Sequence, residues 1–129
     1  MLASVCLALA MYYEARGDGP IGMISSGQVV LNRVADPRFP KDICAVVQQG
    51  GTKLHKCQFS FYCDGKSEIP RDKLAWEQSK TLAAAMLSGV IASPKLSQAT
   101  CYHATFVKPS WSYTLRPIGT VGSHIFYRC

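Results

Sequence analysis

The sequence predicts an α+β fold that is mainly helical, with a small β or loop-rich region in its last third. Between residues 4 and 88, apolar side chains recur at helical spacing, and the runs are bounded by capping residues, glycines and prolines. From residue 93 onward, prolines divide the chain into short extended pieces. The chain has 129 residues, of which 48% are hydrophobic and 17% are charged, which suits one hydrophobic core. We therefore expect a single domain over residues 1–129.

The first predicted helix covers residues 4–16, because this run has no internal glycine or proline and is followed by Gly17-Asp18-Gly19-Pro20. Glu14 falls in its last turn. The residues seven, four and three positions earlier are Leu7, Ala10 and Met11. The carboxyl group therefore shares a helix face with an apolar stripe. Apolar surroundings raise the pKa of a carboxyl group, so Glu14 is a candidate proton donor.

Two further helices are predicted in the first half of the chain. One covers residues 21–34, has apolar residues at helical spacing, and is closed by Asp36-Pro37. The other is short: it begins after Asp42, a typical N-cap, and ends at Gly50-Gly51.

Residues 58–62 alternate polar and aromatic side chains before Asp64-Gly65, which predicts a short strand that runs into a turn. On such a strand Gln58, Ser60 and Tyr62 share one face.

A fourth helix is predicted over residues 72–88, with Gly89 near its end. Its expected stripe is formed by Leu74, Gln78, Leu82, Ala85 and Gly89. Beyond it, residues 100–105 and 123–127 are predicted to be extended.

The net charge of +6 is unevenly distributed, because no acidic residue follows Glu77. A cationic C-terminal part attracts polyanions of several kinds, and a solvated basic face that aids solubility explains the pattern equally well. No cluster of Lys and Arg with interleaved aromatic residues points to nucleic acid, so we expect no nucleic-acid partner. No apolar stretch approaches the roughly 20 residues that span a bilayer, so we expect no transmembrane segment.

Six cysteines, at positions 6, 44, 57, 63, 101 and 129, would allow up to three disulfides and favour an oxidising destination. Cys57 and Cys63 are close enough in sequence to clip a short loop or hairpin, although the pairing is not readable from sequence. Buried free thiols are the alternative.

The opening residues 1–10 resemble the apolar core of a signal peptide. No Lys or Arg precedes this apolar run, and cleavage after Ala10 would remove the helix that leads into Glu14. We therefore expect no signal peptide, so that another device or a longer precursor carries the protein to its site of action.

Several short motifs follow one another along the chain. They are Tyr13-Glu14-Ala15-Arg16-Gly17, Val30-Leu31-Asn32-Arg33-Val34, Pro37-Arg38-Phe39-Pro40, Cys57-Gln58-Phe59-Ser60-Phe61, Cys63-Asp64-Gly65, Tyr102-His103-Ala104, Val107-Lys108-Pro109 with Trp111, and Gly122-Ser123-His124-Ile125-Phe126-Tyr127. This ordered set resembles the SleB-type cell-wall hydrolases, the family of spore-cortex-lytic enzymes and their relatives in other bacteria and phages. The resemblance covers nearly the whole chain.

The resemblance implies a lysozyme-like, lytic-transglycosylase-like domain that cuts peptidoglycan between N-acetylmuramic acid and N-acetylglucosamine. Glu14 matches the family's catalytic glutamate. In such a mechanism the glutamic acid protonates the glycosidic oxygen, and the carboxylate then takes a proton from the C6 hydroxyl of the muramic acid, which closes a 1,6-anhydro ring without water. A single acid suits this route, because the carboxylate pair of most glycosidases is not evident. If Asp18, the nearest second acid, faces the cleft, hydrolysis as a muramidase is the alternative.

Six residues are candidate substrate contacts. Gln58 and Ser60 are expected to hydrogen-bond sugar hydroxyl and acetamido groups, and Tyr62, Tyr102 and Trp111 to support sugar rings. Core packing is the alternative for each aromatic residue. The sixth candidate is His103, which contacts substrate, orients a loop or is a structural histidine.

The segment before His103 departs from the family pattern, because family members commonly have His in place of Cys101. The departure leaves Cys101 available for a disulfide, for instance with a terminal cysteine. We interpret His124 as structural.

Three other functions are possible from the residues. A zinc site would draw on His55, Cys57, Cys63, Cys101 and His103, but their spacing lacks the close ligand pairs of such sites, so we expect no metal and no cofactor. A Cys/His wall amidase would need Cys44 as its nucleophile. A non-catalytic peptidoglycan-binding module would need only the cationic C-terminal part.

For the working environment, we expect a monomer that acts on peptidoglycan glycan strands in the bacterial periplasm or cell wall. The expected owner is a phage, with the protein serving as an endolysin or a virion-associated lysin within the phage particle, and export by another route is the alternative.

Overall fold

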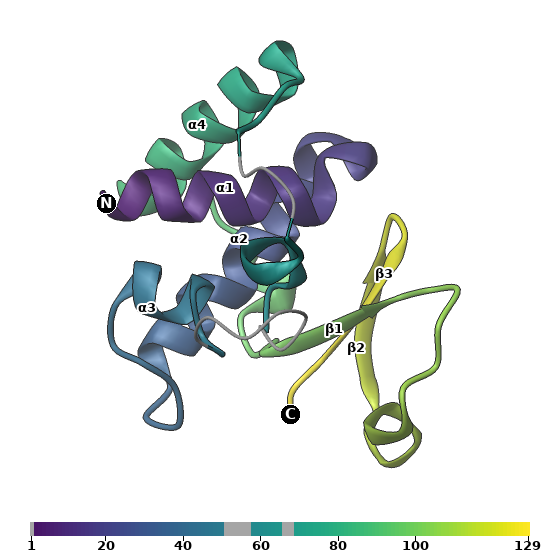
Figure 1. Ribbon diagram of the computed structural model, residues 1–129. Coiled ribbons are helices and arrows are strands. Elements are labelled where there is room, and N and C mark those ends of the chain that lie inside the picture. Colours follow the sequence, from purple (N-terminus) through teal and green to yellow (C-terminus); the bar gives the residue numbers. More distant parts are fainter. Residues whose placement is uncertain (1, 51–57, 66–68) are drawn as a thin grey trace.

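The computed structural model describes residues 2–50, 58–65 and 69–129, except for the side chain of Ser60. Figure 1 shows four α-helices packed together and a small sheet beside them. The helices are α1 (Ala3–Ala15), α2 (Gly19–Ala35), α3 (Ile43–Val47) and α4 (Lys73–Leu87), and the strands are β1 (Cys101–Ala104), β2 (Pro117–Val121) and β3 (His124–Tyr127). Short 3-10 helices lie between them: η1 (Arg16–Asp18), η2 (Ser60–Cys63), η3 (Pro94–Leu96) and η4 (Ser110–Thr114). The predicted α+β, mainly helical class is confirmed.

Helix α1 lies at the centre of the helical part. Every residue from Cys6 to Tyr12 is buried, and the helix contacts α2, α3 and α4. A helix that is apolar on all sides is stable only when other elements surround it. Gly27 of α2 permits close packing here, because a Cβ at this position would lie 2.9 Å from the Sδ of Met86 and 3.0 Å from that of Met11.

The predicted helix boundaries are confirmed to within two residues, and so is the predicted N-cap at Asp42. Asp42 accepts a hydrogen bond from the Cys44 amide at 3.2 Å, and Asp72 accepts one from the Ala75 amide at 3.1 Å, so each carboxylate caps the helix that follows it. After α4, Gly89 adopts a φ of 80°, which ends the helix as expected.

The strand predicted over residues 58–62 is wrong, because this segment contains the 3-10 helix η2. Phe59 and Phe61 are buried against the helices, and the Tyr62 amide donates to the Phe59 carbonyl at 3.1 Å. No neighbouring strand is present among the described residues to pair with the segment, so its alternating pattern is satisfied by a turn. The expectation that residues 58, 60 and 62 share one strand face is therefore also wrong.

The buried face of α4 also differs from the predicted stripe. Leu74 is 84% exposed and Gln78 is exposed, whereas Ser79, Ala83 and Met86 are buried. The face is set by contact with α1 and α2, which buries Ser79, Ala83 and Met86 and leaves the leucine at the start of the helix exposed.

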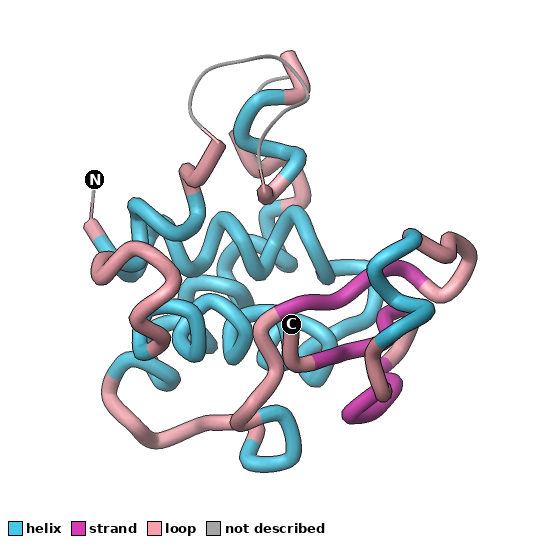
Figure 2. The backbone as a smooth tube through the Cα atoms, turned by 90° about the horizontal axis from the view of Figure 1, so that it is seen from below, coloured by secondary structure: helices cyan, strands magenta, loops and turns pink. Residues whose placement is uncertain are grey.

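The three strands form an antiparallel sheet in the order β1-β3-β2. Seen from below, the strands lie together at one side of the helical part (Figure 2). Phe126 of β3 packs with Val29 of α2, Leu96 and Ala99 in a second core cluster, which attaches the sheet to α2. Strands β1 and β3 fall within the predicted extended pieces. Strand β2 was not predicted. It contains Pro117 and Gly119, two residue types that are uncommon inside strands, and its pairing with β3 is irregular between them.

Two disulfides join distant segments. Cys6 of α1 is bonded to Cys44 of α3, and Cys101 at the start of β1 is bonded to Cys129. The expected disulfide between Cys101 and a terminal cysteine is confirmed, and none of the described cysteines is a free thiol. The expectation for Cys57 and Cys63 involves Cys57, which lies outside the described residues. Within residues 2–50, 58–65 and 69–129, no helix has both the length and the apolar character needed to cross a membrane.

Candidate active site

Glu14 lies in the last turn of α1, where the chain turns into η1. Its carboxyl group points to β1, and the Tyr102 hydroxyl donates a hydrogen bond to its Oε1 at 2.5 Å. Among the residues that the structure describes, the second oxygen, Oε2, has no hydrogen-bond partner. One oxygen of the carboxyl group is thus fixed by the protein while the other is available to a substrate.

The surroundings of Glu14 determine its protonation. Burial raises the pKa of Glu14 above its ordinary value, while the Tyr102 hydrogen bond and electrostatic interactions with His124 and Arg33 lower it, with burial dominant. Burial and the nearby Glu14 also raise the pKa of Tyr102 well above its ordinary value, so the phenol stays protonated as a donor. A carboxyl group that retains its proton to higher pH is suited to general acid catalysis.

Glu14 opens into a cavity of about 230 Å³ between α1, α2 and the outer edge of β1. The cavity is lined by Glu14, Arg33, Gln58, Phe59, Cys101, Tyr102 and Trp111. Glu14 is the only carboxyl group among these residues. The described part of the cavity therefore offers one proton donor and no second carboxylate at glycosidase spacing.

Four of the predicted site residues meet in this cavity: Glu14, Gln58, Tyr102 and Trp111. Gln58 is exposed at its rim, and Trp111 comes from η4. Tyr62 is not among the lining residues and packs against the main core cluster. The side chain of Ser60 lies outside the described residues.

His103 lies behind the cavity and is buried. Its Nδ1 is 2.8 Å from the Ala104 carbonyl and its Nε2 is 2.8 Å from the Tyr127 hydroxyl. Because a carbonyl only accepts, Nδ1 carries the proton and Nε2 accepts from the phenol. The ring stacks on Tyr127 and meets the edge of Trp111 at a centroid distance of 5.6 Å. These contacts position Trp111, one of three aromatic residues that line the cavity.

Asp18, the possible second acid, is bonded elsewhere. Its Oδ2 accepts from the Ser123 hydroxyl at 2.9 Å, from the Ser123 amide at 3.2 Å and from His124 Nδ1 at 3.2 Å. The hydrogen bonds from Ser123 and His124 hold the pKa of Asp18 below its ordinary value, although burial opposes them. Asp18 is thus an ionised link between η1 and the turn that joins β2 to β3, and it does not line the cavity of Glu14.

Sequence reasoning did not assign Arg33, which the structure places in the wall of the cavity. Its guanidinium is buried, and Nε donates to the Thr100 carbonyl at 2.8 Å. The sequence did contain a signal for Arg33. This arginine lies between the apolar residues Leu31 and Val34 of a predicted core helix, a place where an unpaired charge is rare.

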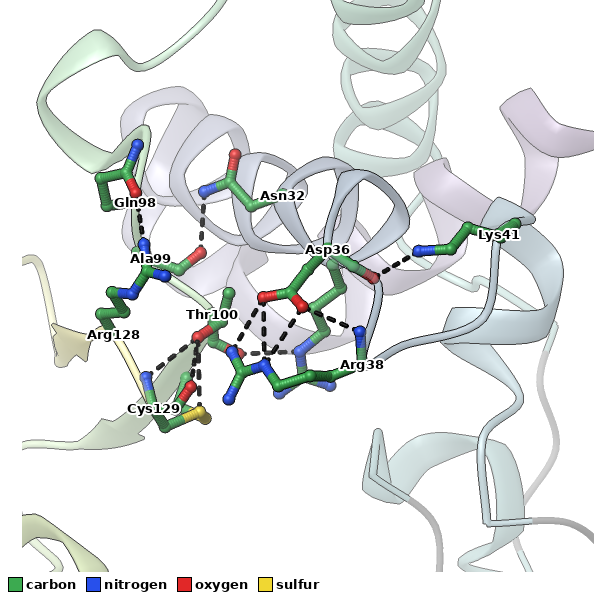
Figure 3. A network of polar contacts seen from close by, with 11 residues as sticks. Asn32, Asp36, Arg38, Lys41, Gln98, Ala99, Thr100, Arg128 and Cys129 are labelled. Carbon is green, nitrogen blue, oxygen red and sulfur yellow. Dashed lines mark hydrogen bonds and ion pairs between the residues drawn. A yellow bond between two sulfur atoms is a disulfide. The ribbon is translucent and has the colours of Figure 1, made fainter.

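A larger cavity of about 470 Å³ lies at the C-terminal end of α2. Figure 3 shows its polar network, in which Asp36 pairs with Arg38, Asn32 bonds the Ala99 carbonyl, and Arg128 bonds Gln98. Hydrogen bonds from Arg38 lower the pKa of Asp36 to about 2. The sole acid lining this cavity is therefore ionised at neutral pH, which makes it unsuitable as a proton donor.

One cysteine that an amidase would need and one that a zinc site would need are both in disulfides. Cys44, the candidate nucleophile of an amidase, is bonded to Cys6 and is not a thiolate. Of the candidate zinc ligands, Cys101 is bonded to Cys129, while His55 and Cys57 lie outside the described residues.

Comparison with known proteins gives consistent matches. The sequence profile of the Cell Wall Hydrolase family matches residues 17–127, a segment that begins just after Glu14. The spore cortex-lytic enzymes of Halalkalibacterium halodurans and Bacillus subtilis are 27% and 26% identical over 121 residues, which is 93% of this chain. The chain spans only 33% and 35% of the length of these relatives.

Two solved structures share the fold. The catalytic domain of the Bacillus cereus SleB protein has a TM-score of 0.75 and 25% identity, and the match covers 98% of this chain and 91% of that one. The catalytic domain of the germination-specific lytic transglycosylase SleB from Bacillus anthracis has a TM-score of 0.76 and 24% identity, with 98% and 95% covered. These matches confirm the expected SleB-type resemblance and the lysozyme-like fold.

Proposed function

Because the chain belongs to the Cell Wall Hydrolase family, we propose that it is a catalytic unit that cuts the glycan strands of peptidoglycan. The bond cut is the one between N-acetylmuramic acid and N-acetylglucosamine, and the product is a 1,6-anhydro-muramic acid end. The observation that supports this proposal is a single carboxyl group of raised pKa in a cavity with no second carboxylate among its described lining residues. No metal or cofactor enters this scheme.

Glu14 acts in both steps of the reaction. Its protonated Oε2 donates to the glycosidic oxygen as the bond to the departing sugar breaks. The resulting carboxylate then takes the proton of the muramic acid C6 hydroxyl, whose oxygen attacks C1 and closes the anhydro ring. Atoms balance without water, and Glu14 ends the cycle protonated.

The surrounding residues assist this cycle. Tyr102 keeps Oε1 occupied, so the proton that is transferred resides on Oε2. Its hydrogen bond and the charge of Arg33 stabilise the carboxylate that forms between the two steps. Gln58 and Trp111 line the same cavity and are the proposed contacts for sugar groups. Ser60, Tyr62 and His103 stay predicted contacts, and the structure provides no direct support for them.

Hydrolysis is the second candidate reaction, and it would need a base to activate water. Asp18 is the nearest second acid in the sequence, but its hydrogen bonds to Ser123 and His124 tie it to the β2–β3 turn. The observed contacts of Asp18 thus favour ring closure over hydrolysis. The expectation that a phage uses the protein as an endolysin or a virion-associated lysin stays a prediction.

Digestion of purified sacculi tests the reaction. We expect the wild-type chain to release anhydro-muramyl fragments, identified by mass spectrometry, and Glu14→Gln to reduce release by about 10²- to 10⁴-fold, the usual contribution of general acid catalysis. The matched control is Glu77→Gln on the exposed side of α4, where Glu77 pairs with Lys80.

Each other outcome contradicts part of the proposal. Reducing-end muramic acid would establish hydrolysis, and release of peptides without glycan cleavage would establish an amidase. Binding to sacculi without soluble products would establish a non-catalytic module, and undiminished activity in Glu14→Gln would remove the assigned acid.

A further inference from the structure

Arg33 is a buried cation that has no counter-ion among the residues that the structure describes. Its side chain is 6% exposed, and among the described residues no carboxylate lies within ion-pair distance of it. Nε donates to the Thr100 carbonyl, but Nη1 is buried and has no hydrogen-bond partner. An unpaired donor on a buried charged group is costly, so native proteins rarely retain one without a use.

The guanidinium is also held rigidly in place. Its Cζ lies 5.0 Å from the ring centroid of Phe39 and 5.4 Å from that of Phe59. The hydrogen bond to Thr100 fixes its position along α2, and Thr100 itself accepts from the Cys129 amide at 3.0 Å. A side chain held between two rings and a carbonyl loses little conformational entropy when it binds a ligand.

Arg33 and Glu14 line the same cavity of about 230 Å³. Glu14 makes no ion pair with the guanidinium, and its Oε1 accepts a hydrogen bond from Tyr102 instead. A ligand that fills the cavity can therefore supply the group that completes the hydrogen bonds of Arg33. A planar guanidinium selects planar oxygen acceptors, namely carboxylates and carbonyls.

We infer that Arg33 binds a carbonyl-type oxygen of the glycan next to the bond that is cut, which makes it a substrate-binding residue of this site. The inference rests on the proposed function for the identity of the ligand. A peptidoglycan strand offers two sources of such an oxygen: the acetamido group of either sugar and the lactyl group of the muramic acid. Binding there places the strand against Glu14 and offsets the cost of the buried charge.

Calorimetric titration of a non-cleaving chain, Glu14→Gln, tests this role apart from the reaction. Two tetrasaccharide ligands distinguish the sources: an alternating N-acetylglucosamine and N-acetylmuramic acid strand without peptides, and chitotetraose, which has acetamido groups but no lactyl group. We expect Arg33→Gln in this background to weaken binding of the muramic-acid strand by about tenfold or more. Arg116→Gln is the matched control, because Arg116 is exposed and lines none of the cavities described above.

The pattern of losses identifies the oxygen. Equal weakening for both ligands assigns the acetamido carbonyl, and weakening of the muramic-acid strand alone assigns the lactyl group. Unchanged affinity for both ligands in a folded Arg33→Gln chain would overturn the inference. Arg33→Lys, which keeps the charge but loses the planar fork, is expected to recover only part of the affinity.

A measurement without substitution at position 33 covers the case in which its variants unfold. In the Glu14→Gln chain labelled with ¹⁵N-arginine, the Arg33 side-chain signals should shift on addition of the strand while the Arg116 signals stay in place. Absence of a shift at saturation would overturn the inference. If sacculi remain intact with the wild-type chain while Arg33-dependent binding persists, the proposed reaction fails and the binding role stands.

Discussion

In the proposed reaction, the hydrogen bond from Tyr102 to Glu14 determines which carboxyl oxygen meets the substrate. Because the phenol keeps its proton, it donates to Oε1 in both protonation states of the acid, and the transferable proton belongs on Oε2. The same bond favours the charged form and limits the rise in pKa that burial causes. In the proposed reaction Glu14 first donates a proton and then accepts one, so a pKa whose rise is limited suits both steps.

Removal of this hydrogen bond should change the pH dependence. In Tyr102→Phe the pKa of Glu14 loses a lowering contribution, so we expect the alkaline limb of the pH–rate profile on sacculi to move to higher pH. The rate at neutral pH should fall about tenfold, because the carboxylate intermediate loses a charge-assisted hydrogen bond. Tyr113→Phe, whose ring is exposed on η4, is the control. An unmoved alkaline limb would show that Tyr102 does not influence the acid.

Glu14 should also reduce stability at neutral pH. The folded chain raises its pKa, so between the unfolded and folded values the native state binds more protons, and stability falls as pH rises through this window. Glu14→Gln removes the charged form, and we therefore expect its melting temperature to exceed that of the wild type at pH 8 but not at pH 3. Thermal melts across pH, with Glu77→Gln as control, measure the difference. Parallel curves for Glu14→Gln and the wild type would contradict the raised pKa.

At the scale of elements, one tight approach connects the first half of the chain to the sheet. Asp18 at the end of η1 reaches the β2–β3 turn through Ser123 and His124. A Cβ on Gly122 would lie 2.6 Å from the Asp18 Cγ, and this glycine has a φ of 55°. The glycine therefore allows the turn to approach the carboxylate, and the resulting link holds the sheet near the end of α1.

Gly122→Ala should weaken this link. We expect a loss of about 1–3 kcal/mol in the free energy of unfolding, from left-handed backbone strain and the clash with Asp18. Denaturant titration measures the loss. Gly17→Ala in η1 is the control, since a Cβ there has no atom within 4 Å. Equal stability of the two variants would mean that the β2–β3 turn relaxes freely and that the contact with Asp18 is not tight.

The helices were predictable from sequence because their signals are local. Caps such as Asp42 and Asp72 act on amides within three residues, so their effect is readable from neighbours alone. The strand at residues 58–62 was not predictable, because alternation becomes a strand only beside a partner strand, and this segment contacts helices. The buried face of α4 likewise depends on α1 and α2, which the sequence of α4 does not contain.

The candidate site was predictable in part for the same reason. Glu14 and its apolar stripe lie on one helix, and the motif around it pointed to the acid. The hydrogen bond between Tyr102 and Glu14 joins residues 88 positions apart. Arg33 becomes a candidate site residue only when the fold places it in the cavity wall. Contacts of this range are set by the packing of α1 and α2 against the sheet, which no local pattern encodes.

At the scale of the whole molecule, the two described disulfides restrain both ends of the chain. Cys6–Cys44 closes a loop of separation 38 and Cys101–Cys129 one of separation 28. Loop-closure entropy for these lengths corresponds to about 3–4 kcal/mol each. The second bond also borders the cavity, since Cys101 is one of its lining residues.

Reduction of the disulfides should therefore lower the stability of the fold, and activity should fall as a result. We expect dithiothreitol, which reduces both bonds, to lower the melting temperature by roughly 20 degrees or more, in line with a loss of about 3–4 kcal/mol per bond. Cys101→Ser/Cys129→Ser should lose activity on sacculi at a lower temperature than the wild type does. A melting temperature that is insensitive to reductant, with the free thiols verified by mass spectrometry, would contradict a stabilising role.

The hydrogen bond between α1 and β1 has a consequence for synthesis. A ribosome makes Glu14 early and Tyr102 late, and between them it makes every helix that separates the acid from the sheet. A nascent chain that has emerged only through α4 has its carboxyl group but lacks the donor that orients it and the strand that closes the cavity. If the chain cuts glycan strands as proposed, competence to cut therefore arrives only once the sheet has been made.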